Sequence, residues 1–218
     1  MKLKSLVLVS IFVLYAQLFG IDTTEVFEPG LSDIEYAVSW NSLSKLFGNE
    51  FLIGYGFKNS VCIGLSCAAD DSDTHSAGVS VIYTCIDNVF SLDIISGYTK
   101  KLAVSDGKYA LGSEAAYRIH NHYTPYTRIT AAADTTLKSY SGTIDLGFSA
   151  ILNDKTESLL EYTLESTGNK NKLASSIAVG LNIVLTDTIE MVDEIRYFSS
   201  PDNTINPISI TIGIIATV

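Results

Sequence analysis

The chain repeats one pattern almost to its last residue: short segments in which apolar and polar side chains alternate. Successive side chains of a β-strand point to opposite faces, so this alternation predicts strands with one apolar and one polar face. The segment 157–165, for example, places Leu160 and Tyr162 on one parity and Glu161 and Glu165 on the other. We count twelve such segments: 34–40, 51–57, 61–66, 78–86, 90–98, 108–119, 127–134, 140–150, 157–165, 173–185, 189–198 and 208–214.

The hydropathy of the chain limits what these strands can form. The mean hydropathy is positive, yet no stretch beyond residue 20 is long and apolar enough to span a bilayer as a helix. A closed barrel solves this conflict, because its apolar face meets lipid and all its backbone groups are paired. An even strand number is also usual for a single-chain bacterial barrel. The sequence therefore predicts an all-β fold, a single antiparallel transmembrane β-barrel of twelve strands over residues 21–218.

The connections between the segments alternate in length. Such barrels have short periplasmic turns and longer external loops, so the alternation predicts that both ends of the barrel domain are periplasmic. The long connections are 41–49, 70–77, 100–107, 134–137, 166–172 and 199–207, and the short ones are 58–59, 87–88, 119–122, 153–155 and 186–188.

The first residues have the composition of an export signal. Lys2 and Lys4 precede an apolar stretch from Leu6 to Tyr15, and Gly20 offers a small residue for cleavage. This is the arrangement of a secretory signal peptide, and the apolar stretch is too short for a membrane anchor. We expect residues 1–20 to be a cleaved signal peptide and the remaining chain to reach the outer membrane.

Two places depart from the simple pattern. The segment 78–86 is apolar on both parities, so its phase stays open. Asp193 falls on the apolar parity of its segment, where a β-bulge or an interfacial position could accommodate it. A secreted soluble β-sandwich would also have alternating strands and is kept as an alternative, although it does not predict the alternation of loop lengths.

Four features of the sequence occur together: the signal peptide, the segment IDTTEVFEPGLS before the first strand, the twelve alternating runs, and the aromatic residues near the ends of these runs. In these features the chain resembles the small outer-membrane β-barrels of Gram-negative bacteria. It is most similar to porin-like or channel-like barrels, including uncharacterised ones grouped with the phenol-degradation-pathway transporter family. One departure is the end Ile215-Ala216-Thr217-Val218, where such barrels commonly end in Phe. The resemblance implies passive transport of small solutes, with outer-membrane lipid and the outer-membrane assembly machinery as partners.

The inward parity carries the residues that could act on a solute. A twelve-stranded barrel should be wider than its side chains can fill, and carboxylates around such a lumen would concentrate cations. The acids could instead pair with arginines and plug the lumen, but seven acids exceed three arginines, so we expect a hydrated interior. The candidate lumen-lining residues are Glu114, Arg118, Arg128, Asp145, Glu157, Glu161, Glu165, Glu190, Glu194 and Arg196.

Several other functions have little support in the sequence. The formal net charge of −10 disfavours nucleic acid as a partner. His120 and His122 form a pair without further ligands at recognisable spacing, and the acidic loop 70–74 beside His75 lacks the pattern of a calcium loop. We therefore expect no metal and no cofactor.

Two alternatives to a channel remain. One is a barrel with a structural or adhesive role, although short loops offer little surface for a partner. The other is an outer-membrane enzyme with a site at one rim, but no nucleophile–base signature is present, so we expect no enzyme. The three cysteines, Cys62, Cys67 and Cys85, are expected to be packing thiols; Cys62 and Cys85 could face each other across a hairpin.

Overall fold

The chain folds into twelve β-strands in the computed structural model. It describes residues 30, 32–42, 44–57, 60–70, 75–102, 107–120, 122–136, 139–167, 172–199 and 207–218, without the side chains of residues 87, 167 and 172. The strands are β1 (Ser32–Asn41), β2 (Phe47–Phe57), β3 (Val61–Asp70), β4 (His75–Asp87), β5 (Phe90–Lys101), β6 (Gly107–Tyr117), β7 (Tyr123–Asp134), β8 (Tyr140–Asn153), β9 (Thr156–Thr167), β10 (Lys172–Thr186), β11 (Ile189–Ser199) and β12 (Ile208–Thr217).

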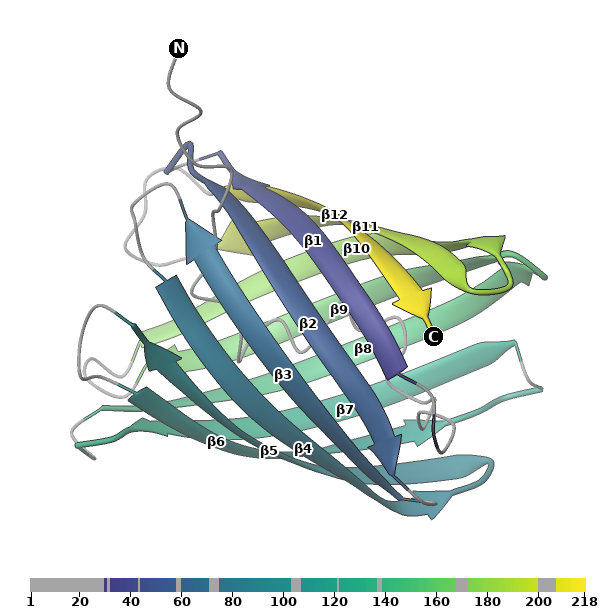
Figure 1. Ribbon diagram of the computed structural model, residues 1–218, viewed down its shortest axis with the longest axis horizontal. Helices are drawn as coiled ribbons and strands as arrows, with labels where there is room; N and C mark the ends of the chain where they lie inside the picture. Colours follow the sequence, from purple (N-terminus) through teal and green to yellow (C-terminus); the bar gives the residue numbers. More distant parts are fainter. Residues whose placement is uncertain are drawn as a thin grey trace.

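The strands form one closed barrel (Figure 1). Each strand pairs antiparallel with its neighbours in sequence, and β1 closes the ring by pairing with β12 from Asp33 opposite Thr217 to Asn41 opposite Ser209. Closure leaves no strand with an unpaired edge, as a barrel in lipid requires. The predicted all-β fold of twelve antiparallel strands is confirmed. The predicted signal peptide, residues 1–20, lies outside the described residues.

The two ends of the barrel differ in their connections. At the end where β1 begins and β12 finishes, which we call the turn end, the strands are joined by residues 58–60, 88–89, 118–122, 154–155 and 187–188. At the opposite end, the loop end, the connections are 42–46, 71–74, 102–106, 135–139, 168–171 and 200–207. The difference in length is smaller than the sequence predicted, because several strands continue into the expected loops; β2 begins at Phe47 and β4 at His75.

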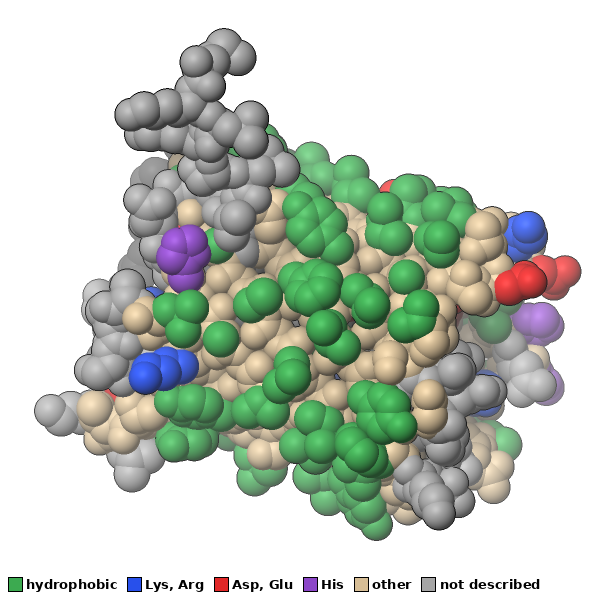
Figure 2. All heavy atoms as spheres, in the orientation of Figure 1, with side chains coloured by type: hydrophobic (Ala, Val, Ile, Leu, Met, Phe, Trp, Pro, Cys, Tyr) green, Lys and Arg blue, Asp and Glu red, His purple; other side chains and the backbone are tan. Residues whose placement is uncertain are grey.

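The outer face of the barrel is apolar. In β12, for example, Ile208, Ile210, Ile212 and Ile214 all point outward and are between 40% and 55% exposed. Figure 2 shows hydrophobic side chains over the side of the barrel and most charged and histidine side chains at its two ends. A broad apolar band between polar ends is the surface expected of a barrel that sits in a bilayer. The described residues contain no helix that is long and apolar enough to cross a membrane.

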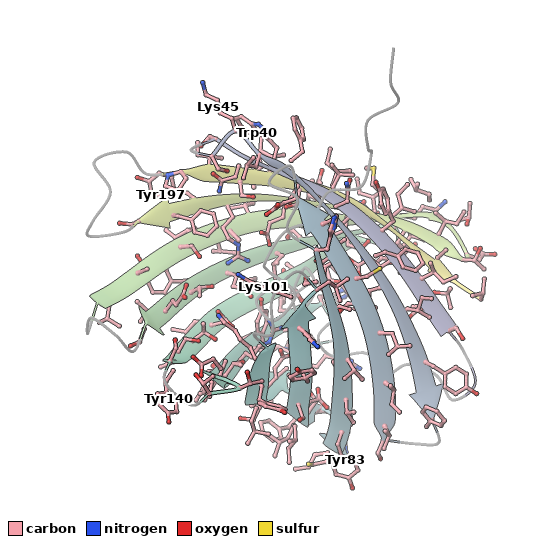
Figure 3. The ribbon with its side chains drawn as sticks, turned by 60° about the vertical axis from the view of Figure 1, so that its left-hand side comes forward. Trp40, Lys45, Tyr83, Lys101, Tyr140 and Tyr197 are labelled. Carbon is pink, nitrogen blue, oxygen red and sulfur yellow. The ribbon has the colours of Figure 1, made fainter. Side chains whose placement is uncertain are left out.

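Aromatic residues flank this band. Trp40, Tyr140 and Tyr197 lie near the loop end, where Figure 3 shows them around the mouth of the barrel. Tyr117 and Tyr123 lie at the turn end and are exposed. Aromatic girdles of this kind sit at the two membrane–water interfaces of outer-membrane barrels.

The strand register shows which way the side chains point in the two irregular segments, 78–86 and 189–198. In β4 the exposed Val79, Val81 and Tyr83 face outward, so the intervening even-numbered residues face the lumen. Asp193 stays on the outward parity of β11 without a bulge at that position, and its Oδ1 accepts a hydrogen bond from the backbone N–H of Leu181 at 3.2 Å.

Candidate functional site: the lumen of the barrel

Strand register brings acids and arginines of neighbouring strands to the same level inside the barrel. Glu114 on β6, Arg128 on β7 and Asp145 on β8 are direct cross-strand neighbours. The Nε of Arg128 donates to Oε2 of Glu114 at 2.7 Å, and these two side chains are only 7% and 3% exposed. A buried pair in such geometry is strongly coupled, because low-dielectric surroundings strengthen the attraction.

A second arginine joins two further acids. Arg196 on β11 donates from Nη2 to Oε1 of Glu161 at 2.7 Å and from Nε to Oε1 of Glu194 at 2.9 Å. Its Nη1 also donates to the hydroxyl oxygens of Thr163 at 3.1 Å and Ser176 at 3.2 Å. The guanidinium therefore holds together side chains from β9, β10 and β11.

Tyr126 links the two groups. Its ring lies on Gly147 of the neighbouring strand β8, and its hydroxyl donates to Oε2 of Glu161 on β9 at 2.7 Å. The absence of a side chain at Gly147 is what lets the ring lie flat across β8. The resulting continuous polar surface we call the charged wall; it consists of Glu114, Tyr126, Arg128, Asp145, Glu161, Glu194 and Arg196.

An apolar layer lies beside the charged wall on its turn-end side. Ala116, Tyr126, Leu159 and Val192 form one cluster of buried residues, and Ile215 packs against it. These residues come from five different strands, and Leu159 and Val192 are 2% and 1% exposed. The layer therefore closes part of the lumen cross-section with hydrocarbon.

The opposite wall is built from small residues. The lumen-facing positions of β2, β3 and β4 carry few large side chains, and the serine hydroxyls lie directly over glycines of the next strand. A Cβ at Gly64 would lie 2.6 Å from Oγ of Ser80, and one at Gly78 would lie 2.8 Å from Oγ of Ser66. We call this surface the small-residue wall; it comprises Gly54, Gly56, Gly64, Ser66, Ala68, Ser76, Gly78 and Ser80.

The structure distributes the ten predicted lumen residues unevenly. Six of them are in the charged wall, where the arginines pair with Glu114, Glu161 and Glu194. Glu190 accepts a hydrogen bond from Nδ2 of Asn182 at 2.7 Å. Glu157 and Glu165, on the inward parity of β9, are partly exposed. The sequence suggested that the acids line a hydrated lumen. In the charged wall they are instead largely buried, and several of them form ion pairs.

Arg118 is the predicted residue that the structure places elsewhere. It follows the last residue of β6, where its backbone N–H donates to the carbonyl of Val89 at 2.7 Å, and its side chain is exposed in the 118–122 turn. Its parity is inward, but the strand ends one residue too early for the side chain to face the lumen.

Among the described residues, the inward acids that sequence reasoning missed include Asp33, Glu35, Glu50, Asp70 and Asp93. Glu35 and Asp93 stand on the inward parity of their segments, which was a sufficient signal. Glu50 was assigned to the edge of an expected loop, whereas β2 begins three residues earlier. Glu35 and Asp93 are each 7% exposed.

No metal or redox centre is evident in the described part of the chain. It contains no group of three or more histidine, cysteine or acidic side chains placed to hold a metal ion. His120 and His122 are exposed in a turn, and residues 71–74 of the acidic loop lie outside the described residues. Cys62, Cys67 and Cys85 are all free thiols; Cys62 lies opposite Ile82 rather than Cys85.

Comparison with known proteins gives a similarity of fold. No protein-family model and no curated protein sequence matches the chain. Among solved structures, the NanC porin matches with a TM-score of 0.71 and 14% identity over 83% of this chain and 98% of that chain. The KdgM porin in complex with disordered oligogalacturonate has a TM-score of 0.69 and 14% identity, over 84% and 98%. An outer-membrane channel from Pseudomonas putida F1 has a TM-score of 0.67 and 9% identity, over 90% and 98%.

Proposed function

We propose that the chain is a narrow, passive outer-membrane channel for small solutes, with a preference for cations. The observation that carries this proposal is the division of the barrel interior into a charged wall and a small-residue wall, inside a closed cylinder with an apolar exterior. An apolar exterior suits lipid and a polar interior suits water, so the barrel can join two aqueous compartments.

The path of a solute is best placed along the small-residue wall. The acids Glu114, Glu161 and Glu194 of the charged wall are buried, whereas Ser66, Gly78 and Ser80 of the small-residue wall are partly exposed. Small side chains leave room beside them, and their hydroxyls can exchange hydrogen bonds with water or with a solute. The charged wall then contributes fixed charges along one side of the path.

The balance of charge supports a preference for cations. Among the described lumen-facing side chains the basic residues are Lys101, Lys108, Arg128 and Arg196, and the acids outnumber them. Figure 3 shows Lys101 inside the mouth of the barrel. A net negative lumen raises the local concentration of cations and repels anions. KdgM binds oligogalacturonate; a solute with several carboxylates would be repelled in this lumen.

Passive transport is favoured over catalysis. The solved structures named above are porins and a channel. The charged wall contains no serine, threonine, cysteine or histidine, which are the usual nucleophiles and bases of hydrolytic sites. Its arginines are engaged by acids of the same wall, so their arrangement suits a fixed electrostatic surface.

Export is part of the proposal. A chain without residues 1–20 should remain in the cytoplasm, whereas the full chain should fractionate with the outer membrane. Recovery of the full-length protein in soluble form from the periplasm would exclude a membrane channel.

A solute-flux experiment tests the transport function. The purified protein is inserted into lipid vesicles, and uptake of lysine, glutamine and glutamate is measured, because these amino acids are similar in size but differ in charge. We expect uptake to be fastest for lysine and slowest for glutamate. The reverse order would contradict the cation preference. No uptake at all would mean that the apolar layer around Leu159 and Val192 plugs the barrel, and a structural or adhesive role would then replace transport.

A further inference from the structure

The acids inside the barrel differ in their electrostatic surroundings. Glu114, Glu161 and Glu194 each have an arginine within 3 Å, so their charge is balanced locally. Two acids on the other side of the barrel, Glu35 on β1 and Glu50 on β2, have no such partner. We call these two residues the acid pair.

Strand register places the two carboxylates of the acid pair close together. Glu35 lies opposite Leu52, and Glu50 lies opposite Ala37, so the two acids are diagonal neighbours on the lumen face. Diagonal neighbours in an antiparallel sheet have their Cα atoms about 7–8 Å apart, within reach of two glutamate side chains. Their carboxylates can therefore approach the same ion from two adjacent strands.

The acid pair has little exposure to solvent and few partners. The side chain of Glu35 makes no hydrogen bond or ion pair with any described residue, although the residue is only 7% exposed. Oε1 of Glu50 is also buried without a hydrogen-bond partner among the described residues. A buried carboxylate oxygen without a partner is costly, so a native protein that keeps one beside a second unpaired acid usually satisfies it with a bound group.

The cross-strand neighbours of the acid pair carry no counter-charge. Across from the acid pair on β3 stand Ala68, opposite Glu50, and Ser66, opposite Leu52. On β12 the neighbour of Glu35 is Ile215. None of these can neutralise a carboxylate. Ser66 is partly exposed, so the acid pair borders the accessible side of the lumen.

We propose that Glu35 and Glu50 form a binding site for a small monovalent cation such as potassium on the wall of the lumen. The site rests on the proposed channel function and assigns its cation preference to these two residues instead of to the acids of the charged wall. Two carboxylates supply oxygen ligands and negative charge. Asp33 lies two residues before Glu35 on the same face of β1 and adds negative charge nearby. The described residues nevertheless contain no group of three or more acidic, histidine or cysteine side chains placed to hold a metal ion, which a tightly held divalent metal would need.

Ion selectivity of variants tests the site. The protein is reconstituted in planar bilayers with a KCl gradient, and the permeability ratio of potassium to chloride is obtained from the reversal potential. Glu35→Gln and Glu50→Gln should each lower this ratio about fivefold, the change in ion occupancy expected when one unit charge about 4 Å away is removed in water. The matched control is Glu165→Gln on β9, which removes the same charge from the inward parity of another strand and should have a smaller effect.

The other possible results of this experiment would contradict the cation site, the channel function or both. If the Glu35→Gln, Glu50→Gln double variant conducts with the wild-type ratio, or if Glu165→Gln lowers the ratio equally, the acid pair is not the site, while the channel function stands. A double variant that no longer folds, judged by its heat-modifiable migration on gels, would also overturn the site, because the carboxylates would then serve the strands. A wild-type protein without current would overturn both the site and the channel.

Discussion

Arg196 on β11 reaches past β10 and donates a hydrogen bond from Nη2 to Oε1 of Glu161 on β9, 2.7 Å away. The same carboxylate accepts from Tyr126 on β7 through its other oxygen. One glutamate thus connects strands on both sides of its own, and Tyr126, Glu161, Glu194 and Arg196 form one network rather than separate pairs. Networks of this kind, when fully bonded, hold a buried polar surface in one arrangement.

Replacing Arg196 should lower the stability of the barrel, because two buried acids then lose their cation. Arg196→Met leaves Glu161 and Glu194 without their cation, and breaking a buried ion pair by deleting one partner destabilises by about 3–5 kcal/mol. The measurement is the free energy of unfolding in urea, followed by the fluorescence of Trp40, the single tryptophan. Arg118→Met is the control, because Arg118 is exposed and should change stability by less than about 0.5 kcal/mol. Equal losses in both variants would mean that the network does not form.

The contact between Tyr126 and Gly147 gives a steric prediction. In Gly147→Ala the new methyl group meets the tyrosine ring, so we expect a loss of about 1–3 kcal/mol, as for other overpacked sites. In a Tyr126→Ala background the same change should cost almost nothing. Gly142→Ala, on the same strand, is the control, since its Cβ would meet only the carbonyl of Thr130 at 3.6 Å. Additive losses from Tyr126→Ala and Gly147→Ala would show that the ring does not lie on β8.

Adjacent residues of β4 test the assignment of faces. Val81 points outward and Ser80 faces the lumen. Val81→Arg should destabilise the membrane-inserted barrel by about 2–4 kcal/mol if it lies near the midplane. Ser80→Arg should fold but slow solute uptake into vesicles, because a long side chain would then stand on the small-residue wall. If Val81→Arg folds normally and Ser80→Arg misfolds, then Val81 faces the lumen and Ser80 faces lipid, contrary to our assignment.

The strand count and most strand phases could be predicted because they depend on local alternation. A charged or strongly polar side chain that faces lipid destabilises the barrel. The alternation of apolar and polar residues in each strand therefore shows which side chains face outward. The phase of 78–86 could not be read, since Ile82 faces the lumen and is apolar like its outward neighbours. Neighbouring strands at fixed register were needed to assign it.

The pairing inside the lumen could not be predicted for a related reason. Whether Arg196 meets Glu161 depends on the register of β9, β10 and β11, which no single segment encodes. Strand ends were also uncertain from the sequence, and two errors in the candidate site lie there: Arg118 falls just beyond β6, and Glu50 falls inside β2 rather than at the edge of a loop. Glu50 was therefore overlooked while an exposed arginine was included.

Single-channel recording from the wild-type protein tests the central claim most directly. The folded protein is added to a planar bilayer that separates two KCl solutions of different concentration, and current is recorded at zero applied voltage and across a voltage ramp. We expect discrete current steps and a reversal potential of the sign that potassium permeation produces. A folded, inserted protein that gives no current steps, or a reversal potential of the sign set by chloride, would contradict a cation-preferring channel.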